Sequence, residues 1–367
     1  MEGIRTDVRV ICIQFLSDGD FINQLKRPQN KSAALPIAMA PEKYQQGVRD
    51  YIPYVDYGIT DSVELKELLT VLTSDNKEDK LQMSDGSFEN ILPTKQLKMS
   101  IDADQLVKTN TIKAADKDKV TAQMEWKVDK SFIGKADLAM YDILVNNNWE
   151  RPIYFATSVS PDTYIGLEKY LYLEGYAYRL LPLKTDPKDE RDKSQVTNTA
   201  VMYDNVMNKM NFSGFKTAKY LDIESRSIAE TTWTFHNTLA TNLILAAKPE
   251  QAMAVMKKSA KDLPLKTYTI QDTINRFNTI RIFYELKDVQ QASLMAKQTL
   301  SFLDLELQYI ASLEPEQQRR RLRDIQVGLS IINGLEEMSR DHQQLELSKE
   351  LKTKYNHYES LFTRSIG

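Results

Sequence analysis

The sequence lacks several features on which common protein functions depend. It holds a single cysteine, Cys12, so no disulfide can close within the chain and no metal site built from several cysteines can form. Its twelve glycines are scattered, and neither G-x-G-x-x-G nor G-x-x-x-x-G-K occurs. We therefore expect no nucleotide site of the glycine-loop type. The rarity of cysteine fits both reducing compartments and exported bacterial proteins, so it leaves the compartment open.

An excess of charge and long apolar runs are also missing. The 48 basic and 51 acidic side chains leave a net charge of -3, which gives no general attraction to nucleic acid or anionic lipid. The longest apolar runs, 10–16 and 243–247, are far shorter than the roughly 18 to 20 residues of a membrane-crossing helix. The first residues do not resemble a signal peptide. We therefore expect either a cytoplasmic protein or an excised piece of something longer, with no nucleic-acid partner.

What the sequence does contain is typical of a globular protein with more than one core. Apolar residues make up 42% and charged residues 27% of the 367 positions. Single cores stop growing beyond roughly 250 to 300 residues, so two domains are expected. Beyond about Asp222 every apolar pattern is helical, and the predicted domains cover 1–215 and 216–367.

The first predicted domain alternates between extended and helical patterns. Its nearly continuous run of β-branched and apolar residues at 8–16 predicts a strand that is covered on both faces. Asp85-Gly86 tolerates the positive φ angles of a tight hairpin. The predicted helices cover 20–26, 62–73, 136–146 and 166–172, and the predicted strands cover 8–16, 80–83, 88–92, 152–157 and 176–183. The pattern predicts an α/β or α+β domain with a central mixed sheet, and residues 102–118 are interpreted as a surface connection.

The second predicted domain contains three segments that resemble one another. Each is a helix, a short polar turn and a second helix, over 237–263, 278–304 and 331–358. A small or apolar residue, Ala252, Ala292 or Leu345, opens each second helix, where a small side chain lets two helices approach. The segments resemble tetratricopeptide repeats, but their offsets of 40 and 53 residues depart from the usual period of about 34. Such pairs stack, share a core and leave a concave face for a partner.

Patterns that could carry chemistry each have a structural alternative. Asp18 and Asp20 have the spacing of a metal-binding D-x-D pair, but the same spacing recurs at 102–104 and 116–118, so helix capping explains them as well. Cys12 is interpreted as a buried, inert thiol within a strand. The three histidines lack ligand spacing. We therefore expect no metal, no cofactor and no catalytic site.

Two further clusters stand out. The basic run 319–323 follows Glu314 and Glu316, which favours a solvated helix start over a nucleic-acid patch. Trp149 lies among three asparagines, Glu150 and Arg151 at a predicted helix-to-strand turn, where open sheets often bind ligands. The alternative is a plain loop with a packed tryptophan.

Three stretches, 2–9, 136–156 and 166–184, carry a family resemblance. They resemble the soluble C-terminal portion of bacterial membrane proteins similar to protein O-mannosyltransferases. In that family a long multi-helix membrane region precedes the first stretch. The resemblance implies that this chain is an extramembrane part at the periplasmic face of the inner membrane, and that the lipid-linked sugar donor and the acidic catalytic residue belong to the membrane region. It carries over only these candidate binding residues, with structural roles as the alternative: Arg5, Asp7, Asn147, Trp149, Arg151, Glu168, Glu174 and Arg179.

Three hypotheses of function follow. The first is a non-catalytic extramembrane region of a membrane-bound glycosyltransferase-like protein, which binds an acceptor protein or partner on the helical-repeat face. The alternative is a helical-repeat scaffold for a complex unrelated to sugar transfer. A third possibility is a free-standing sugar-active enzyme that would use Asp18, Asp20, Glu168 or Glu174.

Overall fold

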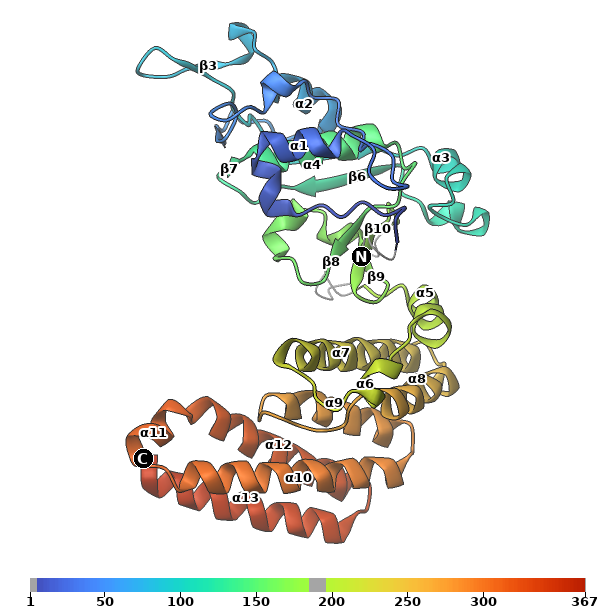
Figure 1. Ribbon diagram of the computed structural model, residues 1–367, viewed down its shortest axis with the longest axis vertical. Coiled ribbons are helices and arrows are strands. Elements are labelled where there is room, and N and C mark those ends of the chain that lie inside the picture. Colours follow the sequence, from blue (N-terminus) through green and yellow to red (C-terminus); the bar gives the residue numbers. More distant parts are fainter. Residues whose placement is uncertain (1–4, 185–195, 367) are drawn as a thin grey trace. The chain divides into compact units, whose positions relative to one another are not determined.

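The computed structural model describes residues 5–184 and 196–366 (Figure 1). The chain divides into two compact units, Met1–Val196 and Thr197–Gly367, here called the N-terminal unit and the helical unit. The N-terminal unit mixes helices with small sheets, and the helical unit is largely α-helical, which confirms the predicted fold class at this level. The predicted domain boundary after residue 215 stays a prediction.

The β-structure described in the N-terminal unit is divided among four small sheets. Its strands are β1 Ile52–Pro53, β2 Val63–Glu64, β3 Leu81–Gln82, β4 Phe88–Glu89, β5 Gln96–Ser100, β6 Gln123–Lys127, β7 Phe132–Ile133, β8 Tyr154–Ala156, β9 Leu171–Leu173 and β10 Ala177–Leu180. The sheet β2-β5-β6 is mixed, since β2 pairs parallel and β6 antiparallel with β5. The sheets β1-β7, β3-β4 and β8-β10-β9 are antiparallel. The expected central mixed sheet is thus limited to three short strands. The predicted hairpin at Asp85-Gly86 is confirmed.

Helix α4 forms the centre of the N-terminal unit. The helices of this unit are α1 Gly19–Leu25, α2 Leu65–Leu72, α3 Ala103–Lys108 and α4 Lys135–Asn147, with short 3-10 turns between them. Both α2 and the 3-10 turn Ile13–Ser17 pack on α4 (Figure 1). The predicted helix 136–146 is confirmed, but it is buried on more than its apolar face, so its charged residues have partners. Lys135 reaches Asp50 at 2.6 Å, and Asp142 accepts the Met39 N–H at 2.9 Å.

Two predictions in this unit are wrong. Residues 8–12 form no strand, and Ile13–Ser17 is a 3-10 helix, because no neighbouring strand supplies a ladder and the segment packs on α4. Cys12 is accordingly half-buried and within hydrogen-bond distance of the Gln14 amide oxygen at 3.2 Å. Residues 102–118 connect β5 to β6 at the surface, as predicted, and this connection contains α3 and a 3-10 helix, Ala114–Lys119.

The segment 166–184 is also more extended than expected. Only Glu168–Tyr170 is helical, as a single 3-10 turn, and β9 follows at once. The high charge of residues 184–194, with Pro187 among them, predicts a mobile loop or a linker, but residues 185–195 lie outside the described part of the chain.

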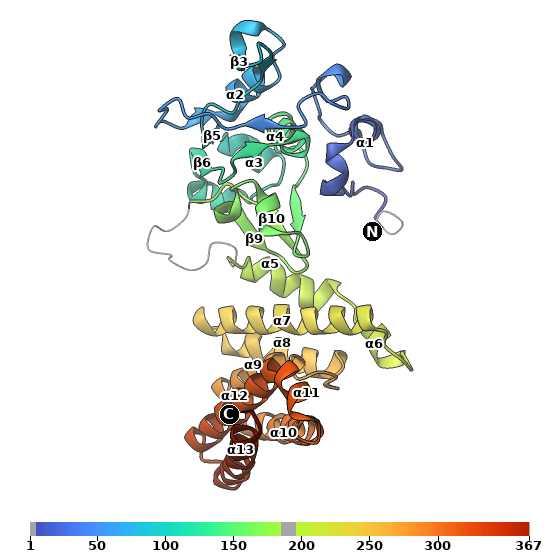
Figure 2. The same ribbon diagram turned by 90° about the vertical axis from the view of Figure 1, so that its left-hand side faces the viewer.

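The helical unit is built mainly from three helix pairs. Its elements are α5 Thr199–Asp204, the π-helix Asn205–Lys209, α6 Ser213–Thr217, α7 Ile223–Leu245, α8 Pro249–Asp262, α9 Asp272–Glu285, α10 Val289–Ala311, α11 Pro315–Arg320, α12 Leu322–Asp341 and α13 Leu345–Ile366. The pairs are α7 with α8, α9 with α10, and α12 with α13. Figure 2 shows α7 and α8 side by side. Across the described parts of both units, no helix combines the length and the apolar content that a membrane crossing needs.

The three turns within the pairs share one backbone geometry. The middle residue of each, Ala247, Lys287 or Gln343, has a positive φ of 55°, 64° and 61°. In each turn the N–H of the residue after the positive-φ residue donates to the carbonyl five residues earlier. The three bonds run from Lys248 to Leu243 at 2.8 Å, from Asp288 to Phe283 at 2.9 Å and from Gln344 to Ser339 at 2.7 Å. This is the Schellman arrangement, which satisfies the free carbonyls at a helix end. The sequence likeness of the three segments therefore corresponds to a common local structure.

The turn geometry corrects one alignment. Counted from the turns, Ala252 and Ala292 occupy the same position and are fully buried. The third hairpin places Ser348 there, 8% exposed, whereas Leu345 is 68% exposed. The prediction that Leu345 permits close helix approach is wrong, because Leu345 lies two residues after its positive-φ residue, whereas Ala252 and Ala292 lie five residues after theirs. The basic run is largely solvated, as predicted, but it spans the end of α11 and the start of α12, with Arg320 paired to Glu316 at 2.7 Å.

Candidate functional site

Four of the eight predicted site residues gather at the sheet β8-β10-β9. Glu174, 7% exposed, accepts a hydrogen bond from the Tyr154 hydroxyl at 3.1 Å. Its carboxylate lies 3.9 Å from the Arg179 guanidinium, which also lies over the Tyr154 ring at 5.9 Å. Burial raises the pKa of Tyr154, and the charge of Glu174 adds to this effect. Register explains the grouping, because Arg179 pairs directly with Tyr154 across β10 and β8.

Arg5 and Asp7 form the outer part of this cluster. The Arg5 guanidinium donates two hydrogen bonds to the Asp7 carboxylate, at 2.9 and 2.8 Å. The bond from Arg5 lowers the pKa of Asp7 to about 2. The charge of Arg5 offsets a small part of the rise in the pKa of Tyr154. The ion pair is exposed, so its contribution to stability is small.

Three further predicted residues hold the turn between α4 and β8. Asn147 is 5% exposed and its side-chain amide donates to the Arg151 carbonyl at 2.8 Å. The Arg151 guanidinium donates to the Ala33 carbonyl at 3.1 Å and to the Ser32 hydroxyl at 2.9 Å. Trp149 packs partly buried against the core with φ at 60°. The expected helix-to-strand turn is confirmed, and these contacts give its residues a structural role in fastening residues 32–33.

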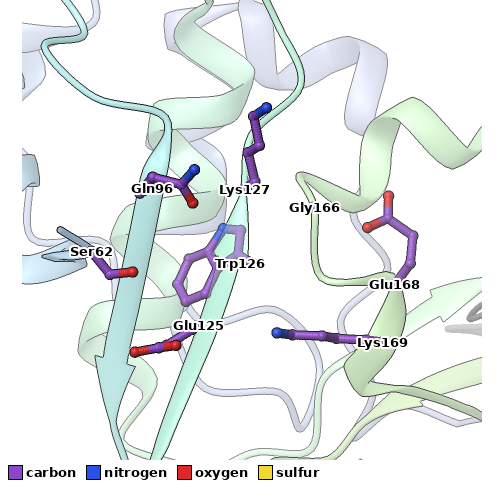
Figure 3. Close-up of a pocket in the computed structure, with 8 residues that line it drawn as sticks. All are labelled: Ser62, Gln96, Glu125, Trp126, Lys127, Gly166, Glu168 and Lys169. Atoms are coloured by element: carbon purple, nitrogen blue, oxygen red, sulfur yellow. The ribbon is translucent and has the colours of Figure 1, made fainter. Parts of the chain in front are cut away.

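The eighth residue, Glu168, lines a pocket (Figure 3). The pocket has a volume of about 420 Å³. It lies beside β6, where that strand faces the segment 166–169. The lining residues are Ser62, Gln96, Glu125, Trp126, Lys127, Gly166, Glu168 and Lys169.

The wall of this pocket is held in place by close backbone packing. Gly166 has φ at 85°, and a Cβ there would meet the Lys127 carbonyl oxygen at 2.3 Å and Trp126 Cδ1 at 2.9 Å. Only glycine fits this approach. The Tyr170 hydroxyl accepts from the Glu125 N–H at 2.8 Å and lies 3.2 Å from the Glu125 carbonyl. The outer edge of β6 is therefore covered by the segment that forms the opposite pocket wall.

The charges in the pocket are only partly compensated. Burial lowers the pKa of Lys169, and the charge of Glu125 offsets part of that shift. The Lys169 ammonium lies 5.0 Å from the centre of the Tyr170 ring. Trp126 is 4% exposed, and its indole Nε1 has no hydrogen-bond partner among the described residues. The pocket thus offers polar groups whose bonding capacity the described chain leaves unused.

The aspartate pairs that resembled metal sites have structural roles. The Asp18 carboxylate accepts the Asp20 N–H at 2.8 Å and caps α1, and Asp102 caps α3 in the same way. Over residues 5–184 and 196–366, no three His, Cys, Asp or Glu side chains are grouped so as to hold a metal ion. The arrangement suits binding through hydrogen bonds and charge.

Sequence reasoning missed most of the pocket. Tyr154 and all lining residues except Glu168 were not among the predicted site residues. One sequence pattern points to part of it, because polar and apolar residues alternate over Gln123–Lys127 with the period of a half-buried strand. The grouping of Ser62, Gln96 and Lys169 depends on tertiary packing.

Residues 1–201 match the family model described as TMEM260-associated domain 2. The chain belongs to this family. No curated protein and no solved structure matches the chain. The match covers the N-terminal unit of this TMEM260-associated domain protein and the first residues of the helical unit. The family description links the domain to a membrane protein family, which agrees with the resemblance at that level and does not mention sugar transfer.

Proposed function

We propose that this chain is the non-catalytic, periplasm-facing extramembrane region of a membrane-bound protein similar to protein O-mannosyltransferases, and that its helical unit binds an acceptor protein or a partner of that protein. The family match supports the link to a membrane protein. The likeness of residues 2–9, 136–156 and 166–184 to such transferases supports the nature of the parent. In this proposal the reaction takes place in the membrane region, and the described chain recognises a polypeptide.

The observation that carries the partner-binding role is an apolar stripe on α10. Leu294, Leu305 and Tyr309 are 51%, 68% and 56% exposed. They lie 11 and 4 residues apart on one face of the helix, where the exposed polar residues Gln298 and Ser301 separate Leu294 from Leu305 and Tyr309. The opposite face of α10 is buried against α9, α12 and α13. Exposed aliphatic and aromatic side chains that line up in this way are typical of protein contact sites.

The helix pairs support a tetratricopeptide-like organisation for this unit. The three hairpins share one turn geometry. The first helix of each hairpin packs on the first helix of the next, since α7 contacts α9 and α9 contacts α12. Stacked pairs of this kind present extended surfaces to peptides and proteins. The rival function is a scaffold that assembles a complex unrelated to sugar transfer.

Photo-crosslinking in the parent membrane protein tests the proposal. A photoreactive residue at position 305 or 309 is expected to capture a polypeptide on the extracytoplasmic side. Position 245 is the matched control, because Leu245 is 73% exposed at the end of α7 and lies outside the stripe. Adducts that are absent, or equally abundant at position 245, would contradict partner binding at this surface.

A second measurement separates the two functions. In the double variant Leu305→Ser and Tyr309→Ser, a partner that is an acceptor of sugar should lose both its crosslink and its glycosylation. If the crosslink disappears while glycosylation is unchanged in the parent's cell, the scaffold function is correct and the link to sugar transfer is wrong.

A further inference from the structure

The pocket beside β6 combines hydrogen-bond donors and acceptors without an excess of either charge. Lys127 and Lys169 supply ammonium donors, and Glu125 and Glu168 supply carboxylate acceptors. Gln96 and Ser62 supply groups that both donate and accept. Trp126 is the one large apolar side chain on the wall. Apolar or lipid-like ligands therefore find little surface to bury here.

From this composition we propose that the pocket binds an uncharged polyhydroxylated ligand, a saccharide unit. Two ammonium and two carboxylate groups leave no net charge. Glu125 and Glu168 therefore repel an anion, and Lys127 and Lys169 repel a cation. A hydroxyl group donates to a carboxylate and accepts from an ammonium, and several hydroxyls on one ring engage both kinds of group. The volume of about 420 Å³ lies within the range of small-ligand sites, roughly 300 to 1,000 Å³.

A buried, unused donor supports a ligand that can accept hydrogen bonds. The Trp126 Nε1–H has no partner among the residues that the structure describes, although the side chain is 4% exposed. A buried N–H without an acceptor costs free energy, and native proteins rarely leave one in that state. Figure 3 shows this ring nitrogen on the side of the ring that faces Gln96 and Lys127. The Nε1 atom itself is closed to solvent, so an oxygen of a bound saccharide would complete it after a small shift of the pocket wall.

The half-buried charges of the segment 166–169 lead to the same conclusion. Neither Glu168 nor Lys169 has a hydrogen bond or salt bridge to a described residue, although both are half-buried. Figure 3 shows the Lys169 side chain extending toward Trp126 and Glu125. Partly desolvated charges gain most from hydrogen bonds that a ligand supplies. The close packing of Gly166 on Lys127 holds these groups in place before a ligand arrives, which reduces the ordering cost of binding.

Ligand-observed NMR and calorimetry on the 367-residue chain test the proposal. The probes are glucose, galactose, mannose, N-acetylglucosamine and their methyl glycosides, together with glucuronic acid, glucosamine and a set of dipeptides. At least one uncharged saccharide is expected to bind with a Kd at or below about 1 mM, and more tightly than its charged counterparts. If no uncharged saccharide binds, or if a dipeptide or a charged sugar binds more tightly, the proposal is wrong.

Variants locate the binding. Lys169→Met, Glu168→Gln and Trp126→Phe are each expected to weaken it by about tenfold, which corresponds to the loss of one good hydrogen bond. Lys108→Met is the matched control, because Lys108 is exposed on α3 and does not line the pocket, and it should leave the Kd unchanged. An unchanged Kd in both Lys169→Met and Glu168→Gln would overturn the assignment. Trp126 belongs to the core, so Trp126→Phe is interpreted only if its Tm shows a folded chain.

This inference is independent of the partner-binding role of the helical unit. The variant Leu305→Ser with Tyr309→Ser should bind the saccharide as the native chain does, because the stripe on α10 contributes no residue to the pocket. Failure of one proposal therefore leaves the other standing, and the two experiments distinguish them.

Discussion

His236 shows how one buried residue can make the stability of the helical unit depend on pH. The side chain is 1% exposed, and its Nδ1 lies 2.7 Å from the Ser259 hydroxyl oxygen. When the Ser259 hydroxyl donates to the Val255 carbonyl at 2.8 Å, the His236 Nδ1–H donates to the Ser259 oxygen. Its Nε2 is buried with no partner among the described residues. Burial, and next the charge of Lys258, lower the pKa of His236 to about 4, so the folded chain holds the neutral ring.

The sign of the pH effect follows from that lowered pKa. The ordinary histidine pKa is about 6.5. Between this pH and about pH 4, His236 is protonated in the unfolded chain but neutral in the folded chain, so stability is lost as the pH falls through this window. We expect the loss from this group to be roughly 3 kcal/mol. In His236→Gln, the free energy of unfolding in urea should depend less on pH over this window. His357→Gln, a change at an exposed site on α13, should keep the native dependence. Equal slopes in all three proteins would contradict the prediction.

The limits of sequence reasoning are also clear at single residues. The resemblance supplied Arg5, Glu174 and Arg179, and the structure brings these three into one neighbourhood around Tyr154. No local pattern distinguishes Tyr154 from the other tyrosines nearby, because its position depends on register across β8 and β10. Nothing in the sequence around Gly166 indicates that a Cβ at this position would lie only 2.3 Å from a backbone carbonyl oxygen.

At the scale of elements, apolar spacing predicted helices better than strands. The helices α2, α8, α12 and α13 have strong internal periodicity, and their existence follows from it. The strands are two to five residues long, which is too short for a period to be distinctive. The run at 8–16 is the opposite case: it has strand composition, but it covers α4 without entering a sheet. A strand needs a partner, and composition cannot supply one.

Arg49 shows how a distant side chain can terminate an element. Its guanidinium, 4% exposed, donates to the carbonyls of Leu72, Thr73 and Ser74 at 3.0, 3.0 and 2.9 Å. These are carbonyls at the end of α2 that lack helical partners. Arg49→Lys replaces the forked donor by a single ammonium and should lower the free energy of unfolding of the N-terminal unit by about 2 to 3 kcal/mol. Arg27→Lys, at an exposed site, should change it by less than about 0.5 kcal/mol. Comparable urea midpoints for the two variants would rule out this role.

Gly334 on α12 packs closely against Phe277 on α9. A Cβ at this position would lie 2.6 Å from Phe277 Cε2 and 2.9 Å from Cζ. Gly334→Ala should therefore destabilise the helical unit by about 1 to 3 kcal/mol, although alanine is the better helix former. Gly214→Ala is the control, since no atom lies within 4 Å of the added methyl group there, and it should be neutral or stabilising. Thermal unfolding followed by circular dichroism measures both. A Tm for Gly334→Ala at or above that of the native chain would show that Phe277 gives way freely.

For the whole molecule, the open question is which unit the residues between 197 and 215 belong to. The change in apolar pattern suggested a boundary after residue 215, while contacts divide the chain after Val196. Residues of this segment are buried within the helical unit: Met202 and Val206 are fully buried, and Phe212 stacks edge-on against His236 at 5.3 Å. Their elements contact α7 and α8.

Two fragments decide this question. Burial of each of these three side chains contributes roughly 1.5 to 3 kcal/mol to stability. The free energy of unfolding of a fragment of residues 197–367 should therefore be several kcal/mol larger than that of a fragment of residues 216–367. The shorter fragment also leaves apolar surface of α7 and α8 uncovered, so it should bind a hydrophobic dye and tend to associate. Urea denaturation of the two fragments at equal concentration gives the difference directly. Equal stability would mean that the segment adds nothing to the helical unit and that the boundary lies where the apolar pattern changes.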